Sequence, residues 1–265
     1  CEKLQKHMRL LLDKGGLYKI YNGNLLFHGC IPLNEDGSLK EIQIYGKKYK
    51  GRELYDVLET YVRRAFFAVD SMEQRKGMDI LWFIWASPSS PLFGKDKMTT
   101  FERYFIADKE THKETKGAYY HLLENEEVVD TLLQEFDLSP ENGHIINGHV
   151  PVHQGEGESP VKCNGKVIVI DGGFCKAYQK VTGIAGYTLI YNSYGLILSA
   201  HEPFTSKEDA VSKESDIVSN RVSVHYTSKR RLVGDTDTGK ALRERIEELM
   251  QLLDAYRKGY IKEKK

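Results

Sequence analysis

The stretch IINGHVPV, residues 145–152, ends an apolar run with a histidine that lies between Gly148 and Pro151. Isoleucine favours a β-strand, whereas glycine and proline interrupt regular structure, so the strand should end just before His149. Binding sites of α/β proteins often form at the carboxyl ends of buried strands, because the rigid strand positions a residue where the chain turns outward. We therefore expect His149 to lie at a strand end, beside a site.

A second histidine has the same surroundings. His28, in LLFHGCIP, also ends an apolar run, and Gly29 and Pro32 follow it. Neutral imidazole is the commonest metal ligand among side chains, so His28 and His149 could together form half of a divalent-metal site. The alternative is that each is an ordinary strand-end histidine whose ring donates to a backbone carbonyl.

The second half of the chain is rich in strand signals. Apart from the opening stretch, the β-branched or aromatic runs are KVIVIDGGF (166–174), GYTLIYNSYGLILSAHEP (186–203) and SNRVSVHY (219–226). Residues 192–195 have the composition of a hairpin tip. In the first half, Asn22-Gly23 between two β-rich runs predicts another hairpin.

Helical periodicity marks the remaining segments. Leu4, Met8 and Leu11 predict a helix that ends at Gly15-Gly16. Residues 52–70 predict an amphipathic helix, and a C-terminal helix should begin at about residue 236. A further helix over roughly 117–137 should bury Leu122, Val129, Leu132, Leu133 and Phe136. The fold class is therefore α/β (α+β), with helices packed outside the sheets.

Composition excludes several classes of protein. Of the 265 residues, 40% are hydrophobic and 29% are charged, as in ordinary globular proteins. The 38 basic residues balance 38 acidic ones, so overall charge indicates neither nucleic acid nor a membrane surface as partner. No apolar run approaches the length of a transmembrane helix, and the four cysteines show no C-x-x-C pair. We expect a cytoplasmic protein with reduced cysteines.

Two other groups of residues could serve a site. Asp171 follows the strand signal KVIVI, where it could hydrogen-bond a ligating histidine or simply form the turn at Gly172-Gly173. Lys95, Lys97 and Arg103 occur in the loop-like segment SPLFGKDKMTTFERYF and are suited to phosphate oxygens. They could equally be solvated surface charges. The sequence contains neither a phosphate-binding G-x-x-x-x-G-K-[ST] motif nor a G-x-S-x-G motif.

Four long stretches carry a family resemblance. LYKIYNGNLLFHGCIPL, SPLFGKDKMTTFERYFI, GHIINGHVPV and VIVIDGGFCKAYQKVTGIAGYTLIYNSYGLILSAHEPF resemble the class III fructose-1,6-bisphosphatases of bacteria such as Firmicutes and Bacteroidetes. The resemblance implies a calcineurin-like metallophosphoesterase fold, in which two packed β-sheets are flanked by helices. It also implies two metal ions, usually Mn²⁺, bridged by a hydroxide that attacks phosphorus. The HG-x-x-P motif supplies His28, and the GH-x-P motif supplies His149, both mainly to the second metal.

The chain departs from that pattern because D-x-H, G-D-x-x-D-R-G and G-N-H-E are all absent. The resemblance assigns to these motifs the first metal, the bridging aspartate, the asparagine ligand and the histidine that assists the leaving group. We therefore expect residues 1–265 to be the C-terminal portion of such a domain, with no catalytic residue of its own. It should bind metal weakly and be inactive on fructose 1,6-bisphosphate, the gluconeogenic substrate of the family. It should also expose a sheet edge or an apolar face that a second copy could cover, giving a homo-oligomer.

Two other functions stay open. The chain could be a non-catalytic module that binds phosphate or regulates another protein, or part of a phosphatase for a different phosphorylated substrate. Apart from the resemblance, no residue pattern in the sequence identifies the sugar as the substrate.

Overall fold

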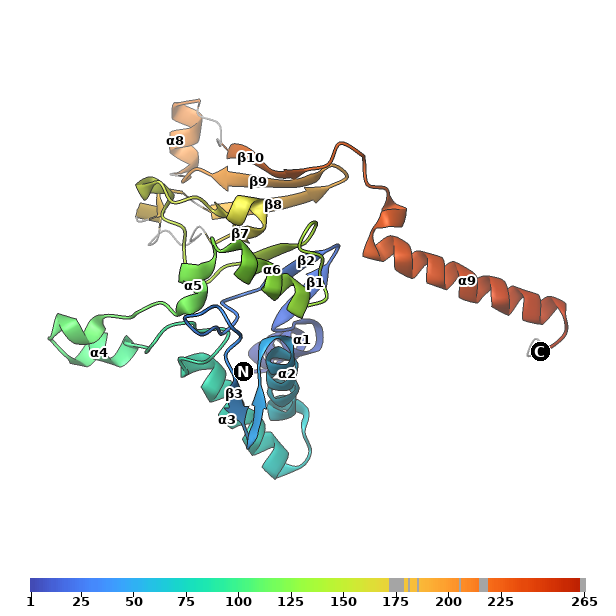
Figure 1. Cartoon of the computed structure of the whole chain (residues 1–265), viewed down its shortest axis with the longest axis horizontal. Helices are drawn as coiled ribbons and strands as arrows, with labels where there is room; N and C mark the ends of the chain where they lie inside the picture. The colour runs from blue at the N-terminus through green and yellow to red at the C-terminus, as the bar shows by residue number, and fades with distance from the viewer. Residues whose placement is uncertain (172–178, 181, 185, 205, 215–218, 263–265) are drawn as a thin grey trace. The chain divides into compact units, whose positions relative to one another are not determined.

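The computed structural model describes residues 1–171, 179–180, 182–184, 186–204, 206–214 and 219–262. It contains both helices and strands, which confirms the mixed α/β fold class (Figure 1). The chain divides into two compact units, Cys1–Thr188 with Ser199–Arg221, and Leu189–Leu198 with Val222–Lys265.

A five-stranded sheet in the first unit has the order β1-β2-β5-β7-β6. Its strands are β1 (Tyr18–Tyr21), β2 (Asn24–Phe27), β5 (His144–Asn147), β7 (Val167–Val169) and β6 (Val161–Lys162). The predicted turn at Asn22-Gly23 joins β1 to β2, which pair antiparallel. Strands β2 and β5 pair parallel, with Leu26 opposite Ile146, and β7 pairs parallel with β5. The carboxyl ends of β2 and β5 therefore lie side by side at one edge of the sheet.

Strands β5 and β7 are completely buried, as expected for parallel strands in the centre of a sheet. The predicted helix over 117–137 is wrong in one respect, because it is two helices, α5 (Ala118–Leu122) and α6 (Glu126–Glu135). Between them, the side chain of Asn125 accepts hydrogen bonds from the backbone amides of Glu127 and Val128 and so starts a new helix. The break leaves Leu122 half-buried and buries Leu123, whereas the four other residues predicted from this segment are buried as expected.

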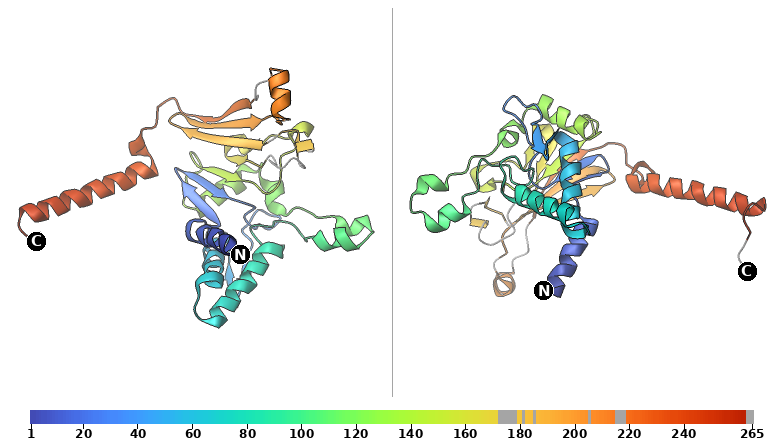
Figure 2. Two further views of the ribbon diagram at one scale, coloured as in Figure 1. Left: turned by 180° about the vertical axis from the view of Figure 1, so that it is seen from behind. Right: turned by 90° about the horizontal axis from the view of Figure 1, so that it is seen from below.

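Two helices and a β-hairpin of the first unit form a hydrophobic cluster of their own. Helix α2 (Gly51–Phe67) packs against α3 (Ser71–Ala86), and the hairpin of β3 (Ile42–Ile44) and β4 (Lys47–Tyr49) adds to them (Figures 1 and 2). The buried residues of this cluster are Ile42, Ile44, Leu54, Leu58, Ile80 and Ile84. The predicted helix at the N-terminus is α1 (Glu2–Lys14), but it buries none of its side chains.

An excursion that we call the arm comprises residues 95–116. An isolated β-bridge between Lys95 and Lys116 closes its base. The arm carries α4 (Thr100–Phe105) and the 3-10 helix η1 (Lys109–His112), and Figure 1 shows α4 at its outer end. Because its aromatic residues point outward, Phe101, Tyr104 and Phe105 are 59–81% exposed.

The remaining strands form a sheet of order β10-β9-β8. They are β8 (Gly186–Asn192), β9 (Gly195–His201) and β10 (Ser219–Tyr226), and the predicted hairpin tip at residues 192–195 joins the first two. Short helical segments occupy Gln154–Glu156 (η2), Cys163–Gly165 (η3), Lys207–Ser212 (α8) and Val233–Asp235 (η4). Within the described ranges, the structure contains no helix with both the length and the apolar composition needed to span a bilayer.

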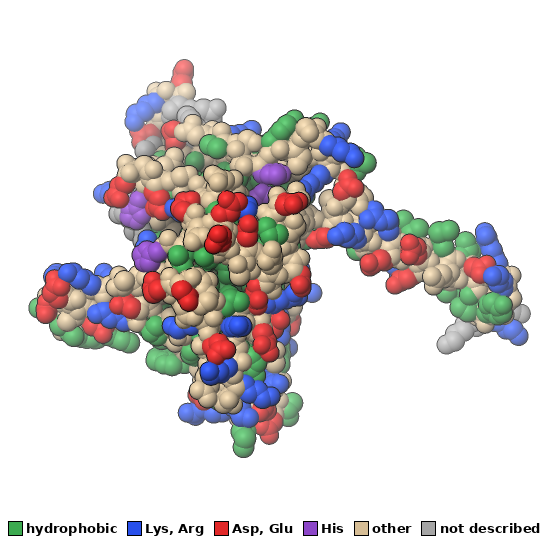
Figure 3. Space-filling model, in the orientation of Figure 1, with side chains coloured by type: hydrophobic (Ala, Val, Ile, Leu, Met, Phe, Trp, Pro, Cys, Tyr) green, Lys and Arg blue, Asp and Glu red, His purple; other side chains and the backbone are tan. Residues whose placement is uncertain are grey.

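Helix α9 (Asp237–Arg257) begins where the sequence predicts, with Thr236 as its cap. Its apolar stripe is not packed as expected. Leu242, Ile246, Leu249, Leu253 and Tyr256 are 43–55% exposed, and Gly239 is the buried residue of this helix. Figure 3 shows hydrophobic side chains at several places along α9.

Candidate metal-ligand site

The two histidines singled out from the sequence lie together. His28 directly follows β2, and His149 lies two residues beyond β5. Their rings approach edge to face with centroids 5.0 Å apart, and His149 Nδ1 is 3.2 Å from His28 Nε2. The backbone joins the same two segments, because the Gly148 amide donates to the His28 carbonyl over 2.9 Å. Parallel pairing of β2 and β5 explains this proximity, since it brings their carboxyl ends to one edge.

A backbone carbonyl fixes the ring of His149. Its Nε2 lies 2.9 Å from the carbonyl oxygen of Phe93. A carbonyl can only accept a hydrogen bond, so Nε2 carries the proton and the lone pair of Nδ1 faces His28. The backbone of His149 has φ +69°, a left-handed conformation that is uncommon for residues with a side chain. The turn therefore holds an unfavourable conformation that points the imidazole at its partner.

The surroundings of His149 favour the neutral form of its imidazole. Burial lowers the pKa of its imidazole below the ordinary value, and the neighbouring His28 lowers it further. The bond to Phe93 opposes this shift, Lys95 adds to it, and the carboxylate of Asp171 opposes it. Neutral imidazole is the form that binds metal, so the surroundings of His149 favour a ligand over a cation.

The spacing of the two nitrogens suits a shared metal ion. Ligand nitrogens at about 2.1 Å from one ion are separated by 3.2 Å when they subtend about 100°. That angle lies between octahedral and tetrahedral values, so the separation of the two nitrogens is compatible with one divalent ion. Across the part of the chain that the structure describes, no group of three or more His, Cys, Asp and Glu side chains is arranged to hold a metal. The histidine pair by itself is therefore smaller than such a group.

A cavity of about 970 Å³ opens beside the pair. Its polar lining includes His28, Asn147, His149 and Asp171, and its apolar lining includes residues of α1 and β2. The backbone carbonyl of Asp171 accepts a hydrogen bond from the Val152 amide over 2.8 Å. Gly172 and Gly173, which the sequence analysis placed in a turn after Asp171, lie outside the described residues. Asp171 is thus near the histidines, and its predicted role in orienting a ligand stays a prediction.

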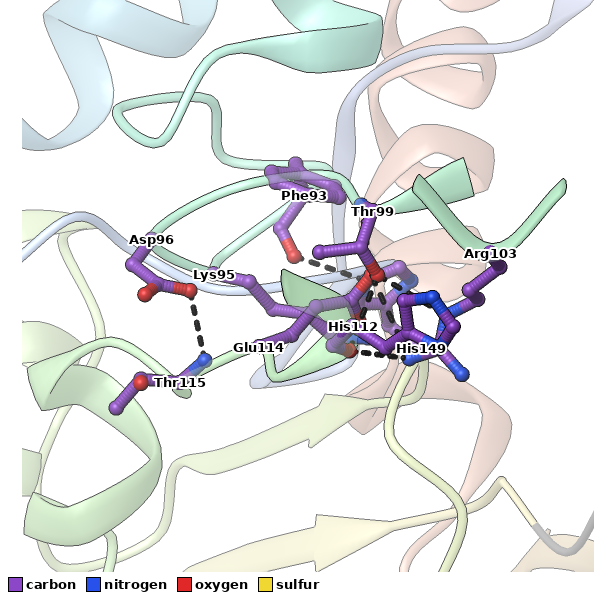
Figure 4. Close-up of polar contacts among 9 residues, drawn as sticks. All are labelled: Phe93, Lys95, Asp96, Thr99, Arg103, His112, Glu114, Thr115 and His149. Carbon is purple, nitrogen blue, oxygen red and sulfur yellow. Dashed lines mark hydrogen bonds and ion pairs between the residues drawn. The ribbon is translucent and has the colours of Figure 1, made fainter. Parts of the chain in front are cut away.

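The three candidate phosphate-binding residues lie in or at the base of the arm. Lys95 forms an ion pair with Glu114 over 2.7 Å, and the guanidinium of Arg103 is 4.0 Å from the same carboxylate. Arg103 also donates to Thr99 Oγ1 and to the His112 carbonyl. Figure 4 shows these side chains around Glu114, close to Phe93 and His149. Lys97 is exposed. Phosphate binding by the three residues stays a prediction, and Lys95 and Arg103 would have to share their charge with Glu114.

Glu114 itself was missed by the sequence analysis. Its partial burial alone would raise the pKa of the carboxyl, but hydrogen bonds from Lys95 and from the amide and hydroxyl of Thr99 outweigh burial and hold the pKa at about 2. Asn147 was also missed, although a polar residue at the end of the apolar run HIIN is a signal that could have been noticed. The carbonyl of Phe93 has no signal in the sequence, because any residue supplies one.

The fold and the site define a mixed α/β protein with a pair of histidines, a candidate metal-ligand pair, at the strand ends. A family profile described as Firmicute fructose-1,6-bisphosphatase matches residues 1–258, and the chain belongs to that family. A class 3 fructose-1,6-bisphosphatase of Clostridioides difficile (strain 630) is 58% identical over 263 residues, which cover 99% of this chain and 40% of the relative.

Other relatives agree. The class 3 fructose-1,6-bisphosphatase of Clostridium tetani (strain Massachusetts / E88) is 56% identical, with 99% of this chain and 40% of the relative covered. That of Clostridium botulinum (strain Loch Maree / Type A3) is 55% identical, with 99% and 39% covered. The chain thus spans about two fifths of the length of these relatives. The comparison with solved structures gave no match.

Proposed function

We propose that this chain supplies the two histidine ligands of a divalent-metal site in a fructose-1,6-bisphosphatase. The single observation that carries the proposal is the convergence of His28 Nε2 and His149 Nδ1 at 3.2 Å, in a chain of this family. The reaction is the hydrolysis of fructose 1,6-bisphosphate to fructose 6-phosphate and phosphate, a step of gluconeogenesis. The resemblance to calcineurin-like metallophosphoesterases supports the same arrangement of metal ligands.

In this proposal the residues of the chain bind and orient. His28 and His149 would hold a divalent ion, which we propose to be Mn²⁺, and the Phe93 carbonyl keeps the Nδ1 lone pair of His149 available. Such an ion, when bound, would supply an activated water and neutralise charge on the phosphoryl group. Asp171 stabilises the ligating histidines electrostatically, and Lys95, Lys97 and Arg103 contribute positive charge for phosphate.

We further propose that these 265 residues do not hydrolyse the sugar bisphosphate by themselves. The family resemblance assigns the other metal ligands to motifs that this sequence lacks, and the described residues present no cluster of three or more ligands. Two imidazoles alone should bind a metal ion weakly, because the number of ligands sets much of the affinity.

The test is an assay of phosphate release from fructose 1,6-bisphosphate with Mn²⁺. The purified chain is compared with the full-length relative from Clostridioides difficile as a positive control. We expect release by the relative and none by the chain, whereas a Co²⁺ titration of the chain should show binding that His28→Ala and His149→Ala each abolish. Metal-dependent release by the chain would overturn the inactivity, and binding unaffected by both substitutions would overturn the ligand assignment.

The substrate, the cellular location and the oligomeric state are proposals that can fail separately from the metal site. If the relative releases phosphate from a different phosphorylated compound at a higher rate, the proposal for the sugar bisphosphate fails while the metal site stands. A cytoplasmic location and a homo-oligomeric state are part of the proposal, and size-exclusion chromatography with light scattering tests the second.

A further inference from the structure

Asn147 connects the segments that carry the two histidines. It is the last residue of β5 and is 1% exposed. Its side-chain Nδ2 donates to the Gly29 carbonyl over 3.2 Å, and its own carbonyl accepts from the Ile170 amide over 2.9 Å. One residue therefore links the carboxyl ends of β2, β5 and β7 immediately beside His28, His149 and Asp171.

The segment that carries His28 is held from the opposite side as well. The Cys30 amide donates to the Pro91 carbonyl over 2.8 Å. The approach is so close that a methyl group on Gly29 would lie 2.4 Å from the same oxygen. Gly29 thus lies between the loop at Pro91 and the amide of Asn147, and loss of either contact frees one side of it.

Of the two polar atoms in the Asn147 side chain, only Nδ2 is hydrogen-bonded within the described residues. Its Oδ1 is buried and has no hydrogen-bond partner among the described residues. A buried polar atom without a partner destabilises a protein. An apolar residue in β5 would avoid that destabilisation, so the bond from Nδ2 to Gly29 is the contribution that an apolar side chain could not make.

We infer that Asn147 is a positioning residue, which holds His28 opposite His149 so that their two nitrogens can bind one metal ion. This inference rests on the proposed function for the metal, but the ring-to-ring geometry can be measured without any metal. Groups that orient ligating histidines typically change metal affinity by about 10-fold to 100-fold when they are removed.

The chain offers a matched control in Asn24. It also lies in the central sheet, is 6% exposed, and has an Oδ1 without a partner among the described residues. Its Nδ2 donates to the carbonyls of Tyr21 and Asn22 at the opposite end of β2, away from His28. Asn24→Ala therefore removes a similar buried amide without touching the histidine pair.

The experiment compares the native chain with Asn147→Ala and Asn24→Ala. Histidine-labelled NMR reports the proton on His149 Nε2 and the nuclear Overhauser contacts between the two rings, and Co²⁺ binding is followed by calorimetry because Co²⁺ binds imidazole more tightly than Mn²⁺. We expect Asn147→Ala to lose the ring contacts and to bind Co²⁺ at least about 10-fold more weakly. Asn24→Ala should keep both, with an affinity within about two-fold of native.

Retention of the ring contacts and the affinity in Asn147→Ala would overturn the inference, as would an equal loss in Asn24→Ala. If the native chain binds no Co²⁺, the proposed metal function fails, and the ring contacts still decide the role of Asn147. Asn147→Leu keeps the approximate size of the side chain but has no group that can donate to Gly29. If the alanine variant does not fold, this second variant should lose the ring contacts, and their retention would overturn the inference.

Discussion

At the scale of single residues, Glu114 determines how the base of the arm is held. Its side chain is 16% exposed and receives Lys95 at 2.7 Å. The hydroxyl and amide of the fully buried Thr99 also donate to it, at 2.8 and 3.1 Å. Phe93, whose carbonyl orients His149, lies two residues before Lys95. The contacts of Glu114 at the base of the arm are therefore connected to the position of the His149 ring.

Glu114→Gln should therefore destabilise the chain at neutral pH. Hydrogen bonds to a charged group contribute about 1.5–3 kcal/mol each, and glutamine keeps only part of this network. The pKa of Glu114 is about 2 in the folded chain, against an ordinary 4.5. Its stabilisation is thus complete above about pH 4.5 and disappears as the pH falls toward 2. Urea denaturation at pH 7 and pH 3 measures both effects.

The control for this prediction is Glu110→Gln in the same arm. Glu110 pairs with Lys113 at the surface, where its side chain is 74% exposed, so its replacement should change the free energy of unfolding by less than about 1 kcal/mol. If both variants lose stability equally at pH 7, the role given to Glu114 is wrong.

At the scale of elements, local residues determined most helix and strand positions, and exceptions have local causes. Asn125 splits the predicted helix over 117–137, because its side chain can satisfy the first amides of a new helix. Helix α3 was not predicted, since its apolar run is short and Trp82 and Trp85 are 63% and 52% exposed rather than lying on a buried face. Periodicity gives no helix signal for such a segment.

The contact of α2 with α3 depends on Gly77. A methyl group at this position would lie 2.3 Å from the Ala65 amide nitrogen and 2.5 Å from the Tyr61 carbonyl oxygen. Alanine is a better helix former than glycine by about 1 kcal/mol, yet Gly77→Ala should destabilise the chain by about 1–3 kcal/mol, because the helices must separate. Thermal unfolding by circular dichroism measures the change. Gln74→Ala, at an exposed position of α3, should be nearly neutral, and a stabilised Gly77→Ala variant would contradict the predicted contact.

At the scale of the whole molecule, the two units differ in how much they bury. The central sheet of the first unit contains residues such as Leu25, Ile145 and Ile168 at 0% exposure. Helix α9, in the second unit, keeps its apolar stripe exposed. Isolated helices are marginally stable in water, because most helical stability in proteins comes from packing.

Hydrogen exchange should therefore differ sharply between these parts. We expect the amides of α9 to exchange at least about 100-fold faster than those of β5, since local opening costs little where few side chains are buried. Mass spectrometry of peptides from the two segments at several protein concentrations makes the comparison. Equal protection that fades on dilution would instead show that a second copy covers the stripe of α9.

The sequence by itself determined the mixed α/β class, the two hairpins, the amphipathic helices and the positions of His28 and His149 at strand ends. These features follow from local periodicity and from glycine, proline and asparagine at turns, which act over a few residues. The family resemblance likewise rests on contiguous stretches of sequence, and the family match over residues 1–258 confirms it.

Only the tertiary structure decided which residues meet. The parallel pairing of β2 with β5 joins positions more than a hundred residues apart, and it brings the two histidines together, with 3.2 Å between their nitrogens. The Phe93 carbonyl, the Asn147 amide and the Glu114 carboxylate act through long-range contacts that no local pattern encodes. Their partners are fixed by the packing of separate segments, which is why the sequence could indicate where the site lies but not how its histidines are held.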